Sequence, residues 1–408
     1  MKKELKALIL AVGDEVTSGR VINSNASFLS QTLDKIGITT VKMVAVPDDK
    51  LAIKNEVEFF IKSDIDLLVT TGGLGPTHDD FTKEVVFETM GIKLEKREEA
   101  VELLNKYFRG NYVECNLKQT YYPIDATLLP NDLGTAMGAV GTWNGKIVSI
   151  LVGPPKELIP MVNNYLVPYL SKLTDSVYLT KEFIVMGTGE SKVEELLKDY
   201  YKETNPYVTT NPYFSLGKIR YLIKAKKTDS DKFNEAVEAF KRIMKEFIVT
   251  DNPSLEIEDL VLEKLKKNNY HISFSESCTG GMLASKLINT SGASAVINES
   301  FVTYADSAKI FTLGVNPETI KKYDVVSREV VEEMALGLQN KTKCEVCVSV
   351  SGYAGPTGGT DKTPVGTVWY AIRINDKTYS YCDYFKTSRN VLREKVTMNI
   401  FYHLFKLL

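Results

Sequence analysis

The chain has 408 residues, of which 44% are hydrophobic and 25% charged. This composition is ordinary for a globular protein, and the length exceeds what one hydrophobic core usually holds, so we expect two or three domains. Lysine and arginine number 50 against 52 aspartates and glutamates, and the net charge of −2 excludes a general attraction to nucleic acid or to anionic membranes.

Strand and helix patterns alternate over the first part of the chain. Apolar runs predict buried strands at 5–12, 39–46 and 66–70, and helical spacing of apolar residues predicts helices at 23–33 and 50–61. This alternation indicates an α/β fold with a parallel sheet and right-handed crossovers. Because ligands of such sheets bind beyond the carboxyl ends of the strands, we expect the loops at 13–15 and 72–80 at one ligand-binding edge.

A glycine-rich loop follows the third predicted strand. Glycines let a backbone approach a phosphate closely, and a hydroxyl adds a further hydrogen-bond donor. The residues that would form this phosphate cradle are Gly72, Gly73, Gly75 and Thr77. A glycine loop alone is a weak signal, but this loop runs directly into two aspartates.

Those aspartates, Asp79 and Asp80, precede a predicted helix at 81–89. They could simply compensate the positive end of the helix dipole. Asp14 and Glu15 are expected at the same edge of the sheet, however, and clustered carboxylates beside a phosphate loop suit Mg²⁺ or Mn²⁺. We therefore predict a divalent-metal site formed by these four residues.

Further patterns extend to about residue 250. Helices are predicted at 99–108 and 160–170, with a strand at 147–152. Beyond about residue 175, strands at 177–185 and 219–225 and lysine-rich helices at 193–201 and 233–247 predict a small α+β domain. No Gly-x-x-Gly lies between two of these helices, so we expect no RNA-clamping loop and interpret the lysines as a solvated face.

The five cysteines give no disulfide framework, because they are odd in number and widely spaced. Cys344 and Cys347 form a C-x-x-C, but no second pair or nearby histidine completes a zinc site. They run into an apolar strand pattern, and we interpret them as buried in or beside that strand.

A turn rich in small residues follows the apolar run at 270–274. Its residues are Ser277, Cys278, Thr279, Gly280 and Gly281, and helical spacing begins at residue 282. Backbone N–H groups at a helix N-terminus attract developing negative charge. A hydroxyl in this turn could therefore be a nucleophile, with the N–H groups near Thr279 to Gly281 as its oxyanion hole.

Such a nucleophile needs a base, and the three histidines of the chain are poorly placed to supply one. A lysine can act instead when burial lowers its pKa. Lys309 would lie one turn into a helix that begins at Asp306, near Tyr304. Alternatively, the turn is only a helix cap and Lys309 a solvated residue. Cys278 also remains a possible nucleophile, because a helix N-terminus favours a thiolate.

The remaining elements complete an α/β pattern. A helix at 327–338, strands at 346–350, 367–374 and 377–385, and a terminal helix at 389–407 are predicted. Arg389 and Arg393 lie one turn apart on the last helix and could reach a substrate phosphate, although arginines near a chain end are usually surface residues.

Three motifs in this region resemble the C-terminal domain of the CinA family, the nicotinamide mononucleotide deamidases. They are 276–281, 302–309 and 355–368, and the similarity runs from about residue 255 to 408. The resemblance implies an amidohydrolase without a metal, in which Ser277 is the nucleophile, Lys309 the base and Tyr304 an assistant. It also implies substrate contacts from Thr279, Gly280, Gly281, Gly355, Thr357 and Gly358. Thr357 stands where the family often has glycine.

The first part of the chain resembles the N-terminal domain of CinA, which is similar to the molybdopterin-binding fold. The motifs are 13–15, 18–25, 70–80, 116–119, 130–136 and 153–157. The resemblance implies an ADP-ribose pyrophosphatase that uses Mg²⁺, Mn²⁺ or Co²⁺. Asn23 would then bind substrate, and Arg20 and Lys118 would neutralise the diphosphate, although both could be solvated surface charges.

The resemblance implies three domains: a molybdopterin-binding-like domain at 1–172, a KH-like connecting domain at 173–252 and a deamidase domain at 253–408. We expect a cytoplasmic homodimer that acts on small nucleotides, with no membrane attachment and no direct nucleic-acid binding. Two other hypotheses remain. The N-terminal domain could bind a molybdopterin-like ligand without turnover, or the protein could act through interactions in DNA uptake or repair.

Overall fold

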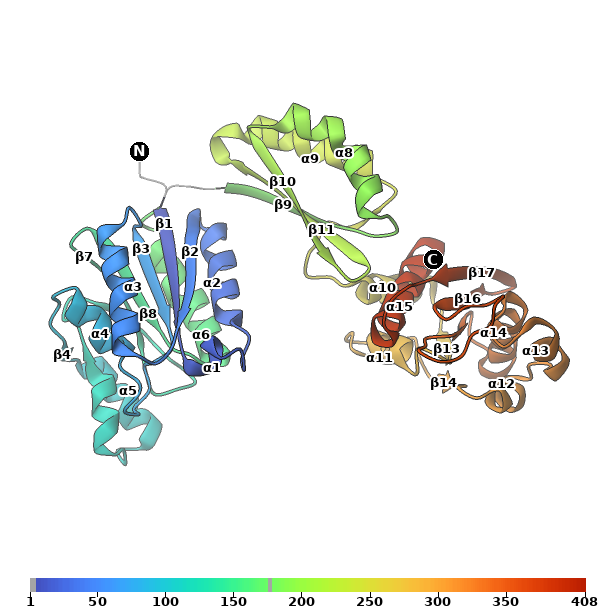
Figure 1. Cartoon of the computed structure of the whole chain (residues 1–408), viewed down its shortest axis with the longest axis horizontal. Helices are drawn as coiled ribbons and strands as arrows, with labels where there is room; N and C mark the ends of the chain where they lie inside the picture. Colours follow the sequence, from blue (N-terminus) through green and yellow to red (C-terminus); the bar gives the residue numbers. More distant parts are fainter. Residues whose placement is uncertain (1–4, 175–177) are drawn as a thin grey trace. The chain divides into compact units, whose positions relative to one another are not determined.

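The computed structural model describes residues 5–174 and 178–408, and it divides into two compact units (Figure 1). One unit comprises residues up to 179 together with 226–228. The other comprises 180–225 and 229–408, so the connecting residues after 180 group mainly with the C-terminal part. Each unit is described by itself.

The first unit contains a six-stranded sheet in the order β2-β1-β3-β8-β7-β6. Its four parallel strands are β1 (Leu5–Val12), β2 (Ile38–Val46), β3 (Leu67–Thr71) and β8 (Lys146–Leu151). Two antiparallel strands, β7 (Gly138–Trp143) and β6 (Thr127–Leu129), extend one edge. The predicted α/β fold is thus confirmed, with an antiparallel extension that the sequence patterns did not predict.

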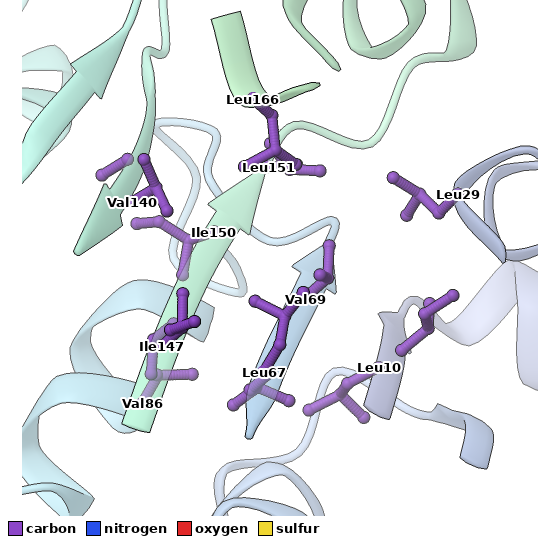
Figure 2. Packing of buried hydrophobic residues seen from close by; sticks show 14 of the residues in the cluster. Leu10, Leu29, Leu67, Val69, Val86, Val140, Ile147, Ile150, Leu151 and Leu166 are labelled. Carbon is purple, nitrogen blue, oxygen red and sulfur yellow. The ribbon is translucent and has the colours of Figure 1, made fainter. Parts of the chain in front are cut away.

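Helices cover this sheet and bury its apolar side chains. They are α1 (Asp14–Thr17), α2 (Ser24–Lys35), α3 (Lys50–Lys62), α4 (Thr82–Thr89), α5 (Glu98–Phe108), α6 (Pro155–Met161) and α7 (Val167–Leu170). A π-helical turn (Val162–Leu166) joins the last two. Figure 2 shows Leu67 and Val69 of β3 packed among side chains of the neighbouring strands. A short pair, β4 (Glu95–Lys96) and β5 (Tyr121–Tyr122), flanks a 3₁₀ turn at Glu114–Thr120.

The second unit begins with a four-stranded sheet in the order β10-β11-β9-β12. Its strands are β9 (Tyr178–Val185), β10 (Val208–Ser215), β11 (Lys218–Lys226) and β12 (Ile248–Thr250), and its helices are α8 (Glu190–Thr204) and α9 (Ser230–Met244). Val177, the first residue of a predicted strand, lies outside the described residues. Strand β10 was not predicted, because most of its side chains are exposed and carry little apolar signal.

The C-terminal sheet has the order β14-β13-β15-β16-β17. Strands β13 (Ile272–Glu276), β14 (Phe301–Val302) and β15 (Val346–Gly352) are parallel, while β16 (Thr367–Ile374) and β17 (Lys377–Tyr384) are antiparallel. The helices are α10 (Ile257–Asn268), α11 (Met282–Ile288), α12 (Asp306–Leu313), α13 (Pro317–Tyr323), α14 (Arg328–Thr342) and α15 (Arg389–Leu407). Cys344 and Cys347 are buried free thiols, as predicted.

Within residues 5–174 and 178–408, no helix has the length and the apolar character that crossing a bilayer would require.

Candidate functional site

Ser277 is the first residue after β13, at the carboxyl end of a strand that lies between β14 and β15 in the C-terminal sheet. Its N–H donates to the Val350 carbonyl of β15 at 3.1 Å, which fixes the end of the strand. On the other side, the Thr303 N–H donates to the Glu276 carbonyl at 2.8 Å and continues the pairing of β14 with β13. Parallel pairing therefore brings the start of α12 beside the serine, as the predicted motif order requires.

The Lys309 amino group lies between Ser277 and the two residues that follow β14. Nζ is 3.2 Å from Ser277 Oγ, 3.0 Å from the Thr303 carbonyl and 3.2 Å from the Tyr304 carbonyl. Lys309 is only 1% exposed, and no carboxylate of the described residues forms an ion pair with it. Burial accordingly lowers the pKa of Lys309 from its ordinary value.

A charged Lys309 donates to all three oxygens, and a neutral Lys309 can keep two of these hydrogen bonds. A neutral lysine has two N–H groups and one lone pair. If the two N–H groups donate to the Thr303 and Tyr304 carbonyls, the lone pair faces Ser277 and can accept its O–H. The structure therefore brings together the predicted nucleophile and base, and the alternative of a solvated Lys309 is wrong.

Tyr304 lies at the edge of the same site but does not bond to the nucleophile. Its hydroxyl accepts from Arg389 Nη2 at 2.8 Å, and Nη1 of the same arginine donates to the Gly355 carbonyl at 2.9 Å. Arg389 is exposed and lines the cavity beside Ser277. This arrangement leaves a cation at the mouth of the cavity.

The predicted oxyanion donors are mostly occupied. The Gly280 N–H donates to the Ser277 carbonyl at 3.1 Å, and the Gly281 N–H donates to the Glu276 carboxylate at 2.9 Å. The Cys278 N–H donates to no other residue in the described part of the chain, and Cys278 lines the cavity. The Gly280 and Gly281 N–H groups are thus occupied, and Thr279 is fully buried and does not line the cavity, so the Cys278 N–H is the better candidate donor.

Burial also decides between the two candidate nucleophiles. Cys278 is 4% exposed, and burial raises the pKa of its thiol to about 12. A thiol with such a pKa is protonated at neutral pH and is a poor nucleophile. Ser277, whose Oγ contacts Lys309, is the better candidate.

The cavity beside Ser277 has a volume of about 190 Å³. It is lined by the predicted residues Ser277, Lys309, Tyr304 and Arg389 and by residues that sequence patterns did not single out: Asp306, Val325, Val326, Ser351, Gly352, Tyr353 and Ala354. Tyr353 donates its hydroxyl to Asp324 Oδ1 at 2.6 Å, a contact between distant segments that no local pattern signals.

Several predicted substrate ligands do not line this cavity: Thr279, Gly280, Gly281, Gly355, Thr357, Gly358 and Arg393. Gly355 contributes its carbonyl to Arg389. Gly358 has a φ of 92°, and a Cβ there would lie 3.3 Å from the Tyr353 ring. Thr279 is fully buried. Gly355 and Gly358 therefore contact residues that line the cavity and do not line it themselves.

A second, larger cavity of about 630 Å³ lies at the carboxyl ends of β1, β3 and β8 in the first unit. The predicted residues that line it are Gly72, Gly73, Gly75, Asn23, Glu15, Asp79 and Asp80. Asp14, Thr77, Arg20 and Lys118 do not. Asn23 accepts from the Ala26 N–H and so caps α2.

The glycine loop is closely packed. Gly72 and Gly73 have positive φ values of 100° and 67°. A Cβ would lie 2.2 Å from the Val12 carbonyl oxygen at Gly72, and 2.0 Å from Thr82 Oγ1 at Gly73. Only glycine satisfies both the conformation and the space at these two positions.

Two of the predicted ligands, Asp80 and Lys118, also hold this loop. Asp80 Oδ2 accepts from the Thr77 N–H at 3.0 Å and from the Thr77 hydroxyl. Lys118 Nζ donates to the Thr77 carbonyl at 2.7 Å and to the Asp80 carbonyl. Helix α4 begins only at Thr82. The ammonium group of Lys118 therefore binds backbone carbonyls of the loop and does not line the cavity, whereas we expected it to neutralise a bound diphosphate.

The charged side chains that line this cavity are all acidic. Among the residues that the structure describes, five carboxylates and no lysine, arginine or histidine line it: Glu15, Asp48, Asp79, Asp80 and Glu157. Burial, with a further contribution from nearby carboxylates, raises the pKa of Asp48. Asp48 was not predicted. The Asp14 N–H donates to Asp48 Oδ2 at 3.0 Å, and the Asp48 N–H donates to Asp14 Oδ1 at 3.2 Å, so each carboxylate accepts from the backbone of the other residue.

The carboxylates are not arranged as a preformed metal centre. In the described ranges, no three histidine, cysteine, aspartate or glutamate side chains converge closely enough to hold an ion. Their oxygen donors and their uncompensated negative charge nevertheless fit a hard divalent cation.

Both halves of the chain are similar to described protein families. Residues 254–408 match the CinA C-terminal domain, and residues 8–172 match the family described as "Probable molybdopterin binding domain". A competence-damage inducible protein from Clostridium perfringens (strain SM101) is 37% identical over 403 residues, 97% of each chain. One from Clostridium novyi is 39% identical over 377 residues, 91% of this chain and 90% of the relative. The crystal structure of a competence damage-inducible protein from Klebsiella pneumoniae is 32% identical and covers 37% of this chain and 93% of its own, with a TM-score of 0.36.

Proposed function

This chain belongs to the CinA family, and from that premise we propose that its C-terminal domain deamidates nicotinamide mononucleotide by serine–lysine catalysis. The observation that carries the proposal is the contact of Lys309 Nζ with Ser277 Oγ at 3.2 Å. A buried lysine without a carboxylate partner is the kind of base that can take a proton from a serine.

The geometry supports the following steps for this proposed reaction. Ser277 Oγ attacks the carboxamide carbon as its proton passes to Lys309, and the Cys278 N–H stabilises the oxyanion. When the C–N bond breaks, Lys309 returns the proton to the departing ammonia. Water then attacks the resulting ester with Lys309 again as base, which gives nicotinic acid mononucleotide and frees Ser277.

The size of the cavity supports this substrate class. At about 190 Å³ it is smaller than the roughly 300 Å³ at which sites for whole drug-sized ligands begin, so it suits the carboxamide-bearing ring alone. The phosphate would stay at the open edge, where the exposed guanidinium of Arg389 can pair with it.

The direct test is an assay of the purified full-length protein on nicotinamide mononucleotide. We expect equal amounts of ammonia and nicotinic acid mononucleotide, measured by coupled assay and by chromatography. Absence of both products at high protein concentration would reject the proposed substrate.

For the first unit we propose metal-dependent hydrolysis of a nucleotide diphosphate such as ADP-ribose. The supporting observation is the cavity with five carboxylates and no cationic side chain among the described residues. An anionic diphosphate would be repelled by this cavity unless a cation intervened. Glu15, Asp48, Asp79 and Asp80 are the candidate ligands, and the cation would polarise the phosphoryl group. Gly73 and Gly75 would supply neutral N–H donors, whereas the Gly72 N–H is bonded to the Leu151 carbonyl at 3.1 Å.

Chelation should therefore separate the two activities. We expect EDTA to abolish release of AMP from ADP-ribose and to change the rate of deamidation by less than about twofold, because no metal takes part in serine–lysine chemistry. Asp79→Asn should also reduce AMP release, while Asp199→Asn, which removes an exposed charge on α8, should not.

Other outcomes would change this account. If ADP-ribose binds but no AMP appears with any divalent ion, the first unit is a binding module. If EDTA reduces both activities in parallel, the two sites are not independent.

A further inference from the structure

Two charged side chains hold the turn that carries Ser277, and neither of them lines the cavity. The first is Glu276, which is 1% exposed. Its Oε2 accepts from the Gly281 N–H at 2.9 Å and from the Leu283 N–H at 3.1 Å, and its Oε1 accepts from the Ala284 N–H at 3.0 Å. One carboxylate thus satisfies three N–H groups at the start of α11.

The second is Arg393 of α15. Its Nε donates to the Cys278 carbonyl at 3.0 Å, and its Nη2 donates to the Thr279 carbonyl at 2.8 Å. Gly280 has a φ of 61°, and a Cβ there would lie 3.3 Å from Arg393 Nη2, so the guanidinium lies close against the turn. In the described part of the chain, no acidic side chain forms an ion pair with Arg393.

These contacts determine the direction of consecutive peptide groups. A trans peptide group is planar, and its N–H points away from its C=O. When Arg393 holds the Cys278 and Thr279 carbonyls, the N–H groups of Thr279 and Gly280 must point away from α15. The Gly280 N–H then closes the turn on the Ser277 carbonyl at 3.1 Å. The Glu276 carboxylate holds the N–H groups of Gly281, Leu283 and Ala284, which follow in the chain.

We propose that Arg393 and Glu276 are positioning residues that lock the peptide planes of the nucleophile turn, and that Arg393 is not a ligand of the substrate phosphate. This inference rests on the amidase function proposed above. The lock keeps Ser277 Oγ beside Lys309 and keeps the Cys278 N–H available for the oxyanion. Arg389, which lines the cavity one helical turn earlier, is left as the phosphate ligand.

Loss of this lock should therefore lower the rate of the chemical step more than it weakens substrate binding. A misplacement of a catalytic group by about 1 Å can cost about 100-fold in rate. We expect Arg393→Met to lower kcat by about 30- to 300-fold with a change in KM below about threefold. Arg393→Lys, which keeps the charge but can reach fewer carbonyls, should give an intermediate kcat.

Two substrates distinguish a positioning role from a phosphate contact. Nicotinamide riboside has the same carboxamide and no phosphate. Arg393→Met should lower kcat on the riboside and on the mononucleotide by the same factor. Lys395→Met, which removes a positive charge from the same helix away from the turn, should change neither. A loss confined to the mononucleotide would overturn the inference, as would an unchanged kcat on both.

A second readout does not depend on the nicotinamide substrate. A fluorophosphonate forms an Oγ–P bond with Ser277 and releases fluoride, while Lys309 accepts the proton. We expect Arg393→Met to be labelled at least about tenfold more slowly than the parent and Lys395→Met. If labelling follows this pattern but nicotinamide mononucleotide is not hydrolysed, the proposed substrate is wrong and the inference stands.

Equal labelling rates of the parent and Arg393→Met would refute the inference. If Arg393→Met fails to fold, as judged by its circular dichroism, Arg393→Lys decides instead. Labelling of the lysine variant at the parent rate refutes the positioning role, and a slower rate supports it.

Discussion

Replacing Ser277 with alanine is expected to lower the rate of nicotinamide mononucleotide deamidation by about 10⁴-fold or more, because loss of a nucleophile removes the covalent route altogether. Ser277 is 7% exposed, and its Oγ is the only hydroxyl among the described residues that forms a hydrogen bond with Lys309 Nζ. The measurement is ammonia release under conditions in which the parent enzyme is saturated.

The matched control is the adjacent thiol. Cys278→Ala should retain at least about a third of the parent rate, because a buried thiol with a pKa of about 12 supplies no thiolate at neutral pH. Only its backbone N–H is needed for the oxyanion, and alanine keeps that group. If Cys278→Ala is inactive and Ser277→Ala is active, the nucleophile is the cysteine.

Lys309→Arg is expected to reduce deamidation by about 10³-fold although it preserves the positive charge, because arginine remains protonated and cannot accept the Ser277 proton. Lys309→Met should be equally inactive. Lys321→Arg, on the exposed helix α13, should be unaffected. An arginine variant with a rate near that of the parent would remove Lys309 from the proton transfer.

The pH dependence follows from the same proton. Lys309 is active when neutral, so kcat/KM should rise as the pH increases through its pKa. Burial lowers that pKa, and the rising limb should therefore lie below the ordinary lysine value of about 10.5. A rate that falls as the pH rises over this range would contradict a lysine base.

Much of the fold could be predicted from local patterns. The predicted strands at 5–12, 346–350 and 367–374 and the terminal helix at 389–407 coincide with β1, β15, β16 and α15 within a few residues. In these elements the apolar residues recur at regular strand or helix spacing over many positions, and such a pattern can be recognised without knowledge of the tertiary structure. Strands β7, β10 and β14 were missed because they are short, glycine-containing or largely exposed.

The contacts within the site could be predicted from the sequence only in part. The pairing of Ser277 with Lys309 was predicted from the resemblance to the CinA family, because the spacing of the two residues gives only a weak signal by itself. The hydrogen-bond partners of Arg393 and Lys118 could not be predicted. Both side chains donate to backbone carbonyls of segments that are distant in the sequence, and only the folded structure brings these segments together. Asp48 was missed for the same reason. Its burial beside other carboxylates arises only when β1 and β2 pair.

The most direct test of the central claim is to locate the covalent intermediate. The protein is mixed with nicotinamide mononucleotide, quenched in acid during turnover and digested, and the peptide that contains residues 277 and 278 is fragmented by mass spectrometry. The account predicts that the acyl group forms an ester with Ser277 and is absent from Ser277→Ala. An acyl group on Cys278, or turnover by Ser277→Ala at the parent rate, would contradict it.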